Sequence, residues 1–390
     1  MWGIVVYNYG ASVAACRTEN EEGKSGYVFG NQYVGGIAGF SDGTEEGIDG
    51  TLSGGKSGVN EAHVIGNSYV GGIVGCSAAV GGTDQNGIVI PDQRADYTLQ
   101  VNRWINKGMV AATGSYAGGI TGYNTGRIFG CSSDVDRSGI LAELADLAAG
   151  GNYAGGIAGY NNGSLGNTPR NSSGIRESGS KGILSAVCYV NGGSYAGGIV
   201  GYNDVDAVVE DYEVAGGYIR SSGSYVGGYA GFNASLAFFM DEDTRERSLH
   251  SNPNEVKGRY CVGGTIGGNV IAVGGTDISA DFTTDNFLGK LSADAFAGGF
   301  IGYNCIVSGG TGREAIHAAA DANIQAFAAA GLEEAAGLLA DHRLAGGDGC
   351  LVIHGRESSS GTHTKLGEIT AQIYEGGEEV VTYSIPLVDQ

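Results

Sequence analysis

Apolar and small residues recur along the chain in a nine-residue pattern, and the stretches between its copies are more polar. An aromatic residue usually comes first, glycine occupies the third, fourth and seventh positions, and apolar residues occupy the second and fifth. The copy YAGGIAGYN at 153–161 is representative, and its short apolar run predicts a β-strand. Full copies begin at eight residues: Tyr33, Tyr69, Tyr116, Tyr153, Tyr195, Tyr225, Cys261 and Phe296.

The copies form a repeat with a fixed unit and variable connections, since their double glycines lie 30 to 47 residues apart. The segment GIVVYNYG, from Gly3, matches the end of a ninth copy. Weaker apolar runs at 109–112, 183–190 and 208–219 predict one or two further strands in each repeat. Such an array is typical of stacked coils, and we expect an all-β solenoid of parallel strands with about 8–9 coils over residues 1–310.

Three glycines in every copy require a physical reason. A glycine in a strand costs about 0.5–1 kcal/mol relative to alanine, so the 24 motif glycines would cost roughly 12–24 kcal/mol. That penalty is as large as the whole net stability of a typical domain, about 5–15 kcal/mol. Stacked coils explain it if another part of the chain lies where each Cβ would stand.

Copies that stack in register place like residues in columns. The first position then predicts a ladder of tyrosine rings and the fifth a column of isoleucine. The ninth position, mostly asparagine, predicts a turn whose stacked amides hydrogen-bond to one another. Both faces of the motif strand are apolar, which predicts a wall covered on both sides. The residues that define these columns are Tyr33, Gly36, Tyr69, Gly72, Tyr116, Gly119, Asn124, Tyr153, Gly156, Asn161, Tyr195, Gly198, Asn203, Tyr225, Gly228, Asn233, Gly264, Asn269, Gly299 and Asn304.

The recurring string Y-[VA]-G-G-I-x-G-[YF]-N resembles the GLUG-type repeat of bacterial surface and adhesin-like proteins, over residues 3–304. The same repeat occurs in the non-catalytic N-terminal region of some IgA-cleaving metallopeptidases. The resemblance implies a right-handed parallel β-helix that serves as a stalk on the cell surface. The copies at Tyr33 and Tyr69 end in serine and the copy at Cys261 lacks both aromatic residues, so we expect distorted coils there.

The chain changes character after the repeats. Residues 311–347 are rich in alanine, and Thr311 with Glu314 matches a capping box. This segment predicts a helical cap on the last coil, with a partner-binding helix as the alternative. Residues 348–390 alternate apolar and polar positions around Gly376 and Gly377, which predicts a short β-hairpin or the start of a following module.

Composition narrows the classes of partner. The chain has 390 residues, of which 74 are glycine and 4 are proline, and its net charge is −21. The acidic balance argues against nucleic acid, whose phosphates require clustered Lys and Arg. No apolar run approaches the length of a membrane span. The sequence contains no signal peptide, so we expect a fragment whose export signal, anchor and further domains lie outside it.

Sequence signals for catalysis are weak. Residues 50–57 read GTLSGGKS and match the phosphate-loop pattern, but no buried strand before them and no helix after them is predicted. The chain contains neither HExxH nor GxSxG, and its six histidines lack paired metal spacing. Seven scattered cysteines form no CxxC pair; Cys76, Cys261 and Cys305 occupy or adjoin motif positions, which indicates small apolar fillers. We predict no catalytic residue and no organic cofactor.

Acidic pairs between the copies raise one alternative, a weak calcium site. The candidates are Asp134, Asp136, Asp204, Asp206, Asp241 and Asp243. The segment from Asp134 begins like a calcium loop, yet Ala145 stands at its twelfth position, where a bidentate glutamate is needed. Carboxylates along one wall also serve β-helical polysaccharide lyases and hydrolases, so a carbohydrate-active enzyme is a second hypothesis.

We expect a non-enzymatic, extracellular repeat or stalk region of a bacterial surface protein. Its role would be scaffolding, or adhesion by multivalent contact with glycan or protein ligands of a host or a neighbouring cell. The alternatives are the carbohydrate-active β-helix enzyme and an ancillary region of a larger surface peptidase. A flat face rich in Tyr, Asn and Ser would favour adhesion, whereas two or three Asp converging with an Arg or Lys would favour a lyase.

Overall fold

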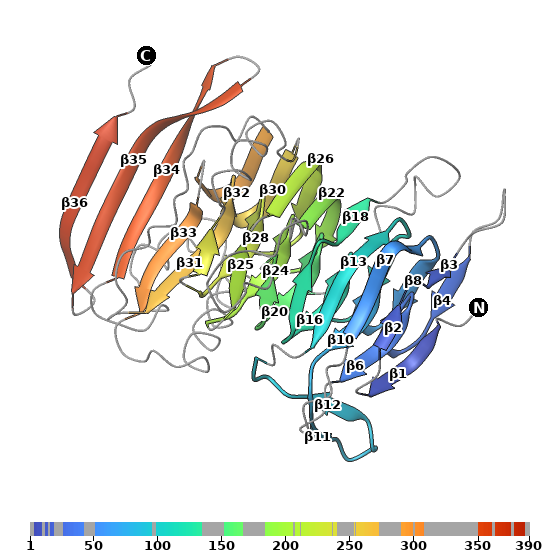
Figure 1. Ribbon diagram of the computed structural model, residues 1–390. Helices are drawn as coiled ribbons and strands as arrows, with labels where there is room; N and C mark the ends of the chain where they lie inside the picture. The colour runs from blue at the N-terminus through green and yellow to red at the C-terminus, as the bar shows by residue number, and fades with distance from the viewer. Residues whose placement is uncertain are drawn as a thin grey trace, which may run out of the picture.

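The computed structural model is built from β-strands, and no helix occurs among the residues that it describes (Figure 1). Most strands run parallel to their neighbours and stack along the length of the array. This arrangement agrees with the expected all-β solenoid of parallel strands. The described residues are 4–9, 12–14, 16–18, 26–42, 51–95, 99–134, 152–166, 184–205, 207–210, 212–235, 237–239, 253, 255–272, 290–298, 301–307, 350–360, 363–375 and 378–386.

Each motif that the structure describes throughout folds into two short strands, or arms, joined by a bend, so the prediction of a single strand was wrong. In the copy at 153–161, β19 (Tyr153–Gly155) is the first arm and β20 (Ala158–Asn161) is the second. Gly156 and Ile157 form the bend between them. The chain reverses here because the double glycine has no side chains to hold the two arms apart.

The second arms form one parallel sheet of nine strands among the described residues. In order they are β1 (Val5–Tyr9), β6 (Ala38–Asp42), β10 (Val74–Ser77), β16 (Thr121–Asn124), β20, β24 (Val200–Asn203), β28 (Ala230–Asn233), β31 (Ile266–Ala272) and β33 (Ile301–Val307). Like residues pair in register, as Tyr160 does with Tyr202. Tyr7 of β1 pairs with Phe40, which confirms that the N-terminal segment is the end of a further copy.

The first arms belong to a second, 19-stranded sheet. They are β5 (Gln32–Gly35), β9 (Ser68–Gly71), β15 (Ala117–Gly118), β19, β23 (Tyr195–Gly197), β27 (Tyr225–Gly227) and the ends of β30 (Glu255–Gly263) and β32 (Lys290–Gly298). The same sheet holds the strands that connect one copy to the next: β2 (Ser12–Ala14), β3 (Arg17–Thr18), β7 (Thr51–Asn60), β13 (Gln100–Asn106), β17 (Arg127–Phe129), β18 (Ser132–Asp134), β21 (Ser164–Leu165), β22 (Leu184–Gly192), β25 (Val208–Glu210), β26 (Tyr212–Ser221) and β29 (Ala237–Phe239).

The connecting strands match the weaker apolar runs of the sequence. Strands β22, β25 and β26 cover most of the stretches predicted at 183–190 and 208–219, and β14 (Val110–Ala112) covers the one at 109–112. From β15 to β18 the chain passes through four strands within one repeat, rather than the expected two or three. The difference arises because each motif contributes two strands instead of one.

Three smaller sheets complete the described part. Strands β4 (Tyr27–Phe29), β8 (His63–Gly66) and β14 form a parallel sheet, and β11 (Val80–Thr83) pairs with β12 (Val89–Pro91) in an antiparallel hairpin. At the C-terminal end, β34 (Cys350–Ser360), β35 (His363–Glu375) and β36 (Glu378–Pro386) form an antiparallel sheet (Figure 1). The pair β35–β36 brackets the two glycines at which the sequence predicts a hairpin. The helical cap predicted at 311–347 lies outside the described residues.

Strand pairing continues through the copies that depart from the consensus. Ser77, which replaces the usual asparagine, pairs in register with Asn124. In the copy at Cys261, Gly268 replaces the second aromatic residue and pairs with Phe232. A Cβ built on Gly268 would lie 2.5 Å from the Tyr225 ring, so neighbouring rings fill its place. The strand pairing of these copies is therefore regular, whereas their first residues, Tyr33, Tyr69 and Cys261, have positive φ of 54°, 56° and 52°. Tyr116, in a copy that keeps the consensus, shares this backbone with φ of 63°.

At each of the three motif positions only glycine fits, because backbone atoms lie where a Cβ would stand. The backbone that approaches differs from one position to the next. In the copy at 69–77, a Cβ on Gly71 would lie 2.0 Å from the carbonyl oxygen of Val74, across the bend. A Cβ on Gly72 would lie 2.2 Å from the carbonyl oxygen of Gly119 in the next copy. A Cβ on Gly75 would lie 2.6 Å from the carbonyl oxygen of Tyr69 in the first arm. No described motif glycine has a positive φ, so space rather than backbone freedom selects glycine.

The bends are hydrogen-bonded along the stack, which leaves no orphaned amide at the reversal. The carbonyl oxygen of Ile157 accepts the N–H groups of Ile120 at 2.9 Å and Thr121 at 3.0 Å. The N–H groups of Ile157 and Ala158 reach the next copy in the same way, both donating to the carbonyl oxygen of Ile199. The fifth motif position thus links each bend to its neighbours.

Two apolar clusters cover the two faces of the motif. The larger contains the second, fifth and sixth motif residues, such as Ala154, Ile157 and Ala158, packed with residues of the connecting strands. The second contains the aromatic residues of the first and eighth positions. The fifth-position column is fully buried, as predicted, at Ile37, Ile73, Ile120, Ile157 and Ile199. Both faces of the motif are covered, which agrees with the apolar pattern on both sides.

Candidate functional site

The first motif residues form a continuous stack of tyrosine rings. From Tyr33 through Tyr69, Tyr116 and Tyr153 to Tyr195, successive ring centroids lie 4.7, 4.8, 4.8 and 4.9 Å apart, with interplanar angles of 6–25°. The next step, from Tyr195 to Tyr225, is 5.5 Å. This spacing matches the distance between paired strands and confirms the predicted tyrosine ladder.

A second aromatic column runs beside the first and meets it edge to face. It includes Tyr123, Tyr160, Tyr202 and Phe232, whose successive centroids lie 4.8, 5.4 and 5.0 Å apart. The ring of Tyr160 stands at 87° to that of Tyr153 in the same motif, with centroids 6.0 Å apart. Stacked and edge-to-face pairs are the two favoured aromatic geometries, each worth about 0.5–1.5 kcal/mol beyond burial. The two columns therefore form a second core outside the aliphatic one.

Three of the stacked tyrosines adopt left-handed backbone, two of them in copies that depart from the consensus. Tyr33, Tyr69 and Tyr116 have φ of 54°, 56° and 63°. Left-handed backbone costs a residue with a side chain roughly 1–2 kcal/mol, so each of these sites is strained. At Tyr69 and Tyr116, two stacking neighbours and an edge contact offset a cost of this size. Cys261, which has no ring, shares the conformation with φ of 52°, so stacking alone does not select it.

The ninth motif residues form an unbroken chain of side-chain amides. Asn124 donates to Asn161 at 2.8 Å, Asn161 to Asn203 at 2.9 Å, Asn203 to Asn233 at 2.9 Å, and Asn233 to Asn269 at 2.8 Å. All five residues are at most 3% exposed. The amide of Asn161 also bonds the N–H and the carbonyl of the residue two positions on, which closes the turn. These contacts confirm the prediction of stacked, hydrogen-bonded amides.

A second, shorter amide chain was not predicted. Asn60 donates to the side chain of Asn106 at 2.8 Å and accepts a hydrogen bond from Thr18 at 2.6 Å. Both asparagines end strands that lead back toward a motif, and both are fully buried. The sequence signal was faint, because only two copies carry asparagine at this position.

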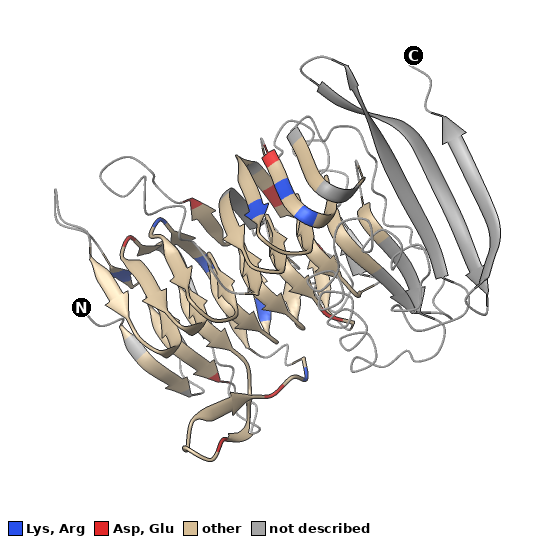
Figure 2. Cartoon of the chain, turned by 180° about the vertical axis from the view of Figure 1, so that it is seen from behind, with Lys and Arg blue, Asp and Glu red and all other residues tan. Residues whose placement is uncertain are grey.

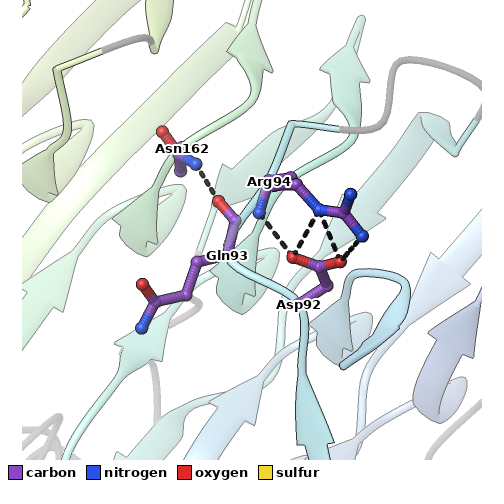
Figure 3. Close-up of polar contacts among 4 residues, drawn as sticks. All are labelled: Asp92, Gln93, Arg94 and Asn162. Carbon is purple, nitrogen blue, oxygen red and sulfur yellow. Dashed lines mark hydrogen bonds and ion pairs between the residues drawn. The ribbon is translucent and has the colours of Figure 1, made fainter. Parts of the chain in front are cut away.

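The hairpin β11–β12 and the segment after it cross the aromatic columns and tie distant copies together. The hydroxyl of Tyr33 donates to the carbonyl oxygen of Val89 in β12. Further along, the side-chain amide of Asn162 donates to the carbonyl oxygen of Gln93 (Figure 3). Asp92 and Arg94 flank this contact and form a local pair, in which Arg94 donates from Nη2 to Asp92 Oδ2 at 2.6 Å (Figure 3). The Arg94 guanidinium holds the pKa of Asp92 below its usual value.

The structure gives different surroundings to the two calcium candidates whose side chains it describes. Asp134 is exposed at the end of β18, whereas Asp204 is fully buried and accepts hydrogen bonds from the Tyr160 hydroxyl and the Val205 N–H. Burial, and then the nearby Asp204 carboxylate, raise the pKa of Tyr160 well above its ordinary value. Asp136, Asp206, Asp241 and Asp243 lie outside the described residues. The described part holds no group of three or more His, Cys, Asp or Glu side chains suited to a metal ion.

Four cysteines within the described part are thiols rather than disulfides: Cys16, Cys76, Cys131 and Cys261. Cys76 and Cys261 replace tyrosine in the aromatic columns and are completely buried, which agrees with their reading as small fillers. Burial raises the pKa of Cys131 to about 12 and also raises the pKa of Cys76 and Cys261. A thiol that stays protonated and buried is a poor nucleophile.

Alkylation of the folded chain should therefore discriminate among the thiols. We expect iodoacetamide at pH 8 to modify Cys16, which is partly exposed, at least ten-fold faster than Cys76, Cys131 or Cys261. Mass spectrometry of the peptides gives each rate. Repeating the reaction in urea should remove the difference, and equal rates without urea would contradict the buried placement.

The outward side of three connecting strands carries the other candidate site. On β22, β26 and β30 the residues alternate between the aliphatic core and the surface, with Val190, Ile219 and Val256 pointing inward. Seven outward residues of these strands lie close together, and we name them the basic face: Tyr189, Asn191, Tyr218, Arg220, Glu255, Lys257 and Arg259. Figure 2 shows charged residues gathering on these neighbouring strands near the C-terminal end of the array.

Four side chains of the basic face contact one another, whereas Arg259 donates from Nη2 to the Tyr260 hydroxyl at 3.2 Å. Arg220 donates from Nε at 2.9 Å and from Nη2 at 2.6 Å to Glu255, and its guanidinium carbon lies 4.1 Å from the centroid of the Tyr218 ring. The Tyr189 ring meets the Tyr218 ring edge to face at 5.2 Å. Sequence reasoning missed this face, because its residues come from three repeats and only strand register brings them together.

Comparison with known proteins found no similar protein. No protein-family model matches the chain, and no curated protein or solved structure gives a significant match. In the described part of the chain, no helix is both long and apolar enough to cross a membrane.

Proposed function

We propose that the chain is a non-enzymatic, extracellular repeat region of a bacterial surface protein, of the GLUG type. Residues 1–310 would form a right-handed parallel β-helix of about 8–9 coils, capped by a helical segment at 311–347. The region would hold a binding surface away from the cell and contact glycan or protein ligands of a host or neighbouring cell. Further domains of the same longer chain would supply export and anchoring.

One observation supports this proposal above the others, the unbroken column of stacked side chains. Tyrosine rings and asparagine amides, the residues that a binding or catalytic site would display, are used here to join each copy to the next. Successive copies repeat the same contact from Tyr33 to Tyr225 in the ring ladder and from Asn124 to Asn269 in the amide chain. Such a column stabilises a longer rod with each added copy, because each copy brings its own neighbours. This is the arrangement expected of a spacer.

The test compares scaffolding with carbohydrate cleavage. We expect the chain to leave polygalacturonate, alginate and hyaluronan at their original length after prolonged incubation, measured as new reducing ends. We also expect an array of glycans and matrix proteins to show binding that strengthens when the chain is displayed in several copies on one particle. New reducing ends that rise with the amount of folded chain, and vanish when it is heated, would favour the carbohydrate-active enzyme instead.

A further inference from the structure

The basic face stands out on this chain because of its charge. Among the side chains that the structure describes on this face, Arg220, Lys257 and Arg259 contribute three positive charges and Glu255 contributes one negative charge, a balance of +2 on a chain of net charge −21. Lys257 and Arg259 are exposed, and the Arg220 side chain is 44% exposed. At physiological ionic strength charges are screened beyond about 8 Å, so the charges close to a bound anion matter more than the net charge of the chain.

We propose that the basic face binds a linear anionic glycan, a sugar chain that carries carboxylate or sulfate groups. This inference rests on the proposed function, since it names the ligand of an adhesive repeat region. Lys257 and Arg259 bind the acidic groups, Asn191 bonds to hydroxyl groups, and Tyr189 and Tyr218 give the sugar rings an apolar surface with polar edges.

The geometry favours a flat, extended ligand. Tyr189 and Tyr218 occupy paired positions on adjacent strands, and Asn191, Arg220 and Lys257 form the next row of paired positions. The polar row therefore runs across the strands, parallel to the axis along which the copies stack. The bidentate contact with Glu255 keeps the Arg220 guanidinium over the Tyr218 ring, so the surface is ordered before a ligand arrives.

Two other classes of macromolecule fit the face less well. Nucleic acid carries one charge per about 1.7 Å of duplex, and binding it takes many cations on a chain that here is strongly acidic. A protein partner needs a fully buried apolar centre, whereas the outward positions of this face are polar or tyrosine. An acidic sugar polymer with one carboxylate per ring has more widely spaced charges than duplex nucleic acid and needs neither feature.

Titration calorimetry on the full chain tests the proposal. The probes are a polygalacturonate hexamer, which carries only carboxylates, dextran sulfate, which carries only sulfates, neutral dextran and a single-stranded oligonucleotide. We expect at least one of the two acidic glycans to bind, neutral dextran not to bind, and the double variant Lys257→Gln/Arg259→Gln to bind at least ten-fold more weakly. Lys107→Gln, which removes an exposed lysine several strands away, is the matched control and should bind like the parent.

The outcomes separate this proposal from the proposed function. Equal affinity of the double variant and the parent, or binding of the oligonucleotide alone, would overturn the glycan site and leave the scaffold proposal intact. Shortening of the hexamer during the titration would instead overturn the non-enzymatic proposal. Circular dichroism of each variant, unchanged from the parent, ensures that a lost affinity reflects the face rather than the fold.

Discussion

Replacing Gly201 by alanine should destabilise the folded chain by about 3 kcal/mol or more, the upper end of the cost of overpacking. The added Cβ would lie 2.6 Å from the Ala154 nitrogen, 2.6 Å from the Gly159 oxygen and 2.9 Å from the Tyr195 oxygen. All three are backbone atoms of paired strands, so no side chain can rotate away to make room. Urea unfolding gives the loss of stability, and hydrogen exchange should show it concentrated in the copies at 153–161 and 195–203.

The control for this variant is Gly87→Ala in the turn between β11 and β12. Gly87 has φ of 76° but no atom within 4 Å of a built Cβ, so the substitution carries conformational strain alone, about 1–2 kcal/mol. A Gly201→Ala variant no less stable than Gly87→Ala would contradict the close approach. In the N-terminal partial copy, Val6 occupies the same motif position as Gly201. Its side chain is 75% exposed, and no first arm of its own copy lies against it among the described residues. A side chain is therefore tolerated at this position where no first arm approaches.

The columns could be predicted from the sequence because stacking places like residue over like. Once the repeat was recognised, the ring ladder at Tyr153 and Tyr195 and the amide chain at Asn161 and Asn203 followed from strand spacing alone. The cost of the glycines pointed correctly to close approach rather than to unusual backbone. These are consequences of periodicity, which a single sequence records directly.

The fold of each motif could not be predicted in the same way. Alternation along a nine-residue strand assigns Tyr153 and Tyr160 to opposite faces, whereas the bend at Gly156 and Ile157 brings both rings into one cluster. Two arms of three or four residues are too short for a period of two to reveal them. The left-handed backbone of Tyr69 also leaves no trace in composition, since glycine or asparagine would be the expected residue.

The candidate site was harder still to predict. Tyr189, Tyr218 and Lys257 belong to connecting segments whose lengths differ from one repeat to the next, so no periodic signal aligns them. Which residues lie side by side depends on the register in which β22, β26 and β30 pair, and that register shifts at a bulge between β22 and β26. The contact of Asn162 with Gln93 likewise depends on the path of an insertion that occurs in one repeat.

Replacing Asn161 by aspartate should cost about 3–5 kcal/mol at pH 7, the penalty for an uncompensated buried charge. The change preserves shape, but the atom that now donates to Asn203 at 2.9 Å becomes an oxygen facing another oxygen. Burial, and then the two facing acceptors, should raise the pKa of the new carboxyl in the folded chain above its unfolded value of about 3.9. The folded state then binds the proton more tightly, so the variant keeps most of its stability below that value and loses it as the pH rises toward the raised pKa.

Chemical unfolding at pH 4 and pH 7 measures this difference, with Asn67→Asp as the matched control. Asn67 is exposed, and its side-chain oxygen accepts a hydrogen bond from Thr113 at 3.1 Å, which a carboxylate also accepts. An exposed substitution of this kind changes stability by about 0.5 kcal/mol or less at either pH. If Asn161→Asp behaves like Asn67→Asp, the buried amide chain does not join the copies as described. A loss that grows from pH 4 to pH 7 only in Asn161→Asp identifies the amide proton donated to Asn203 as the group that the stack requires.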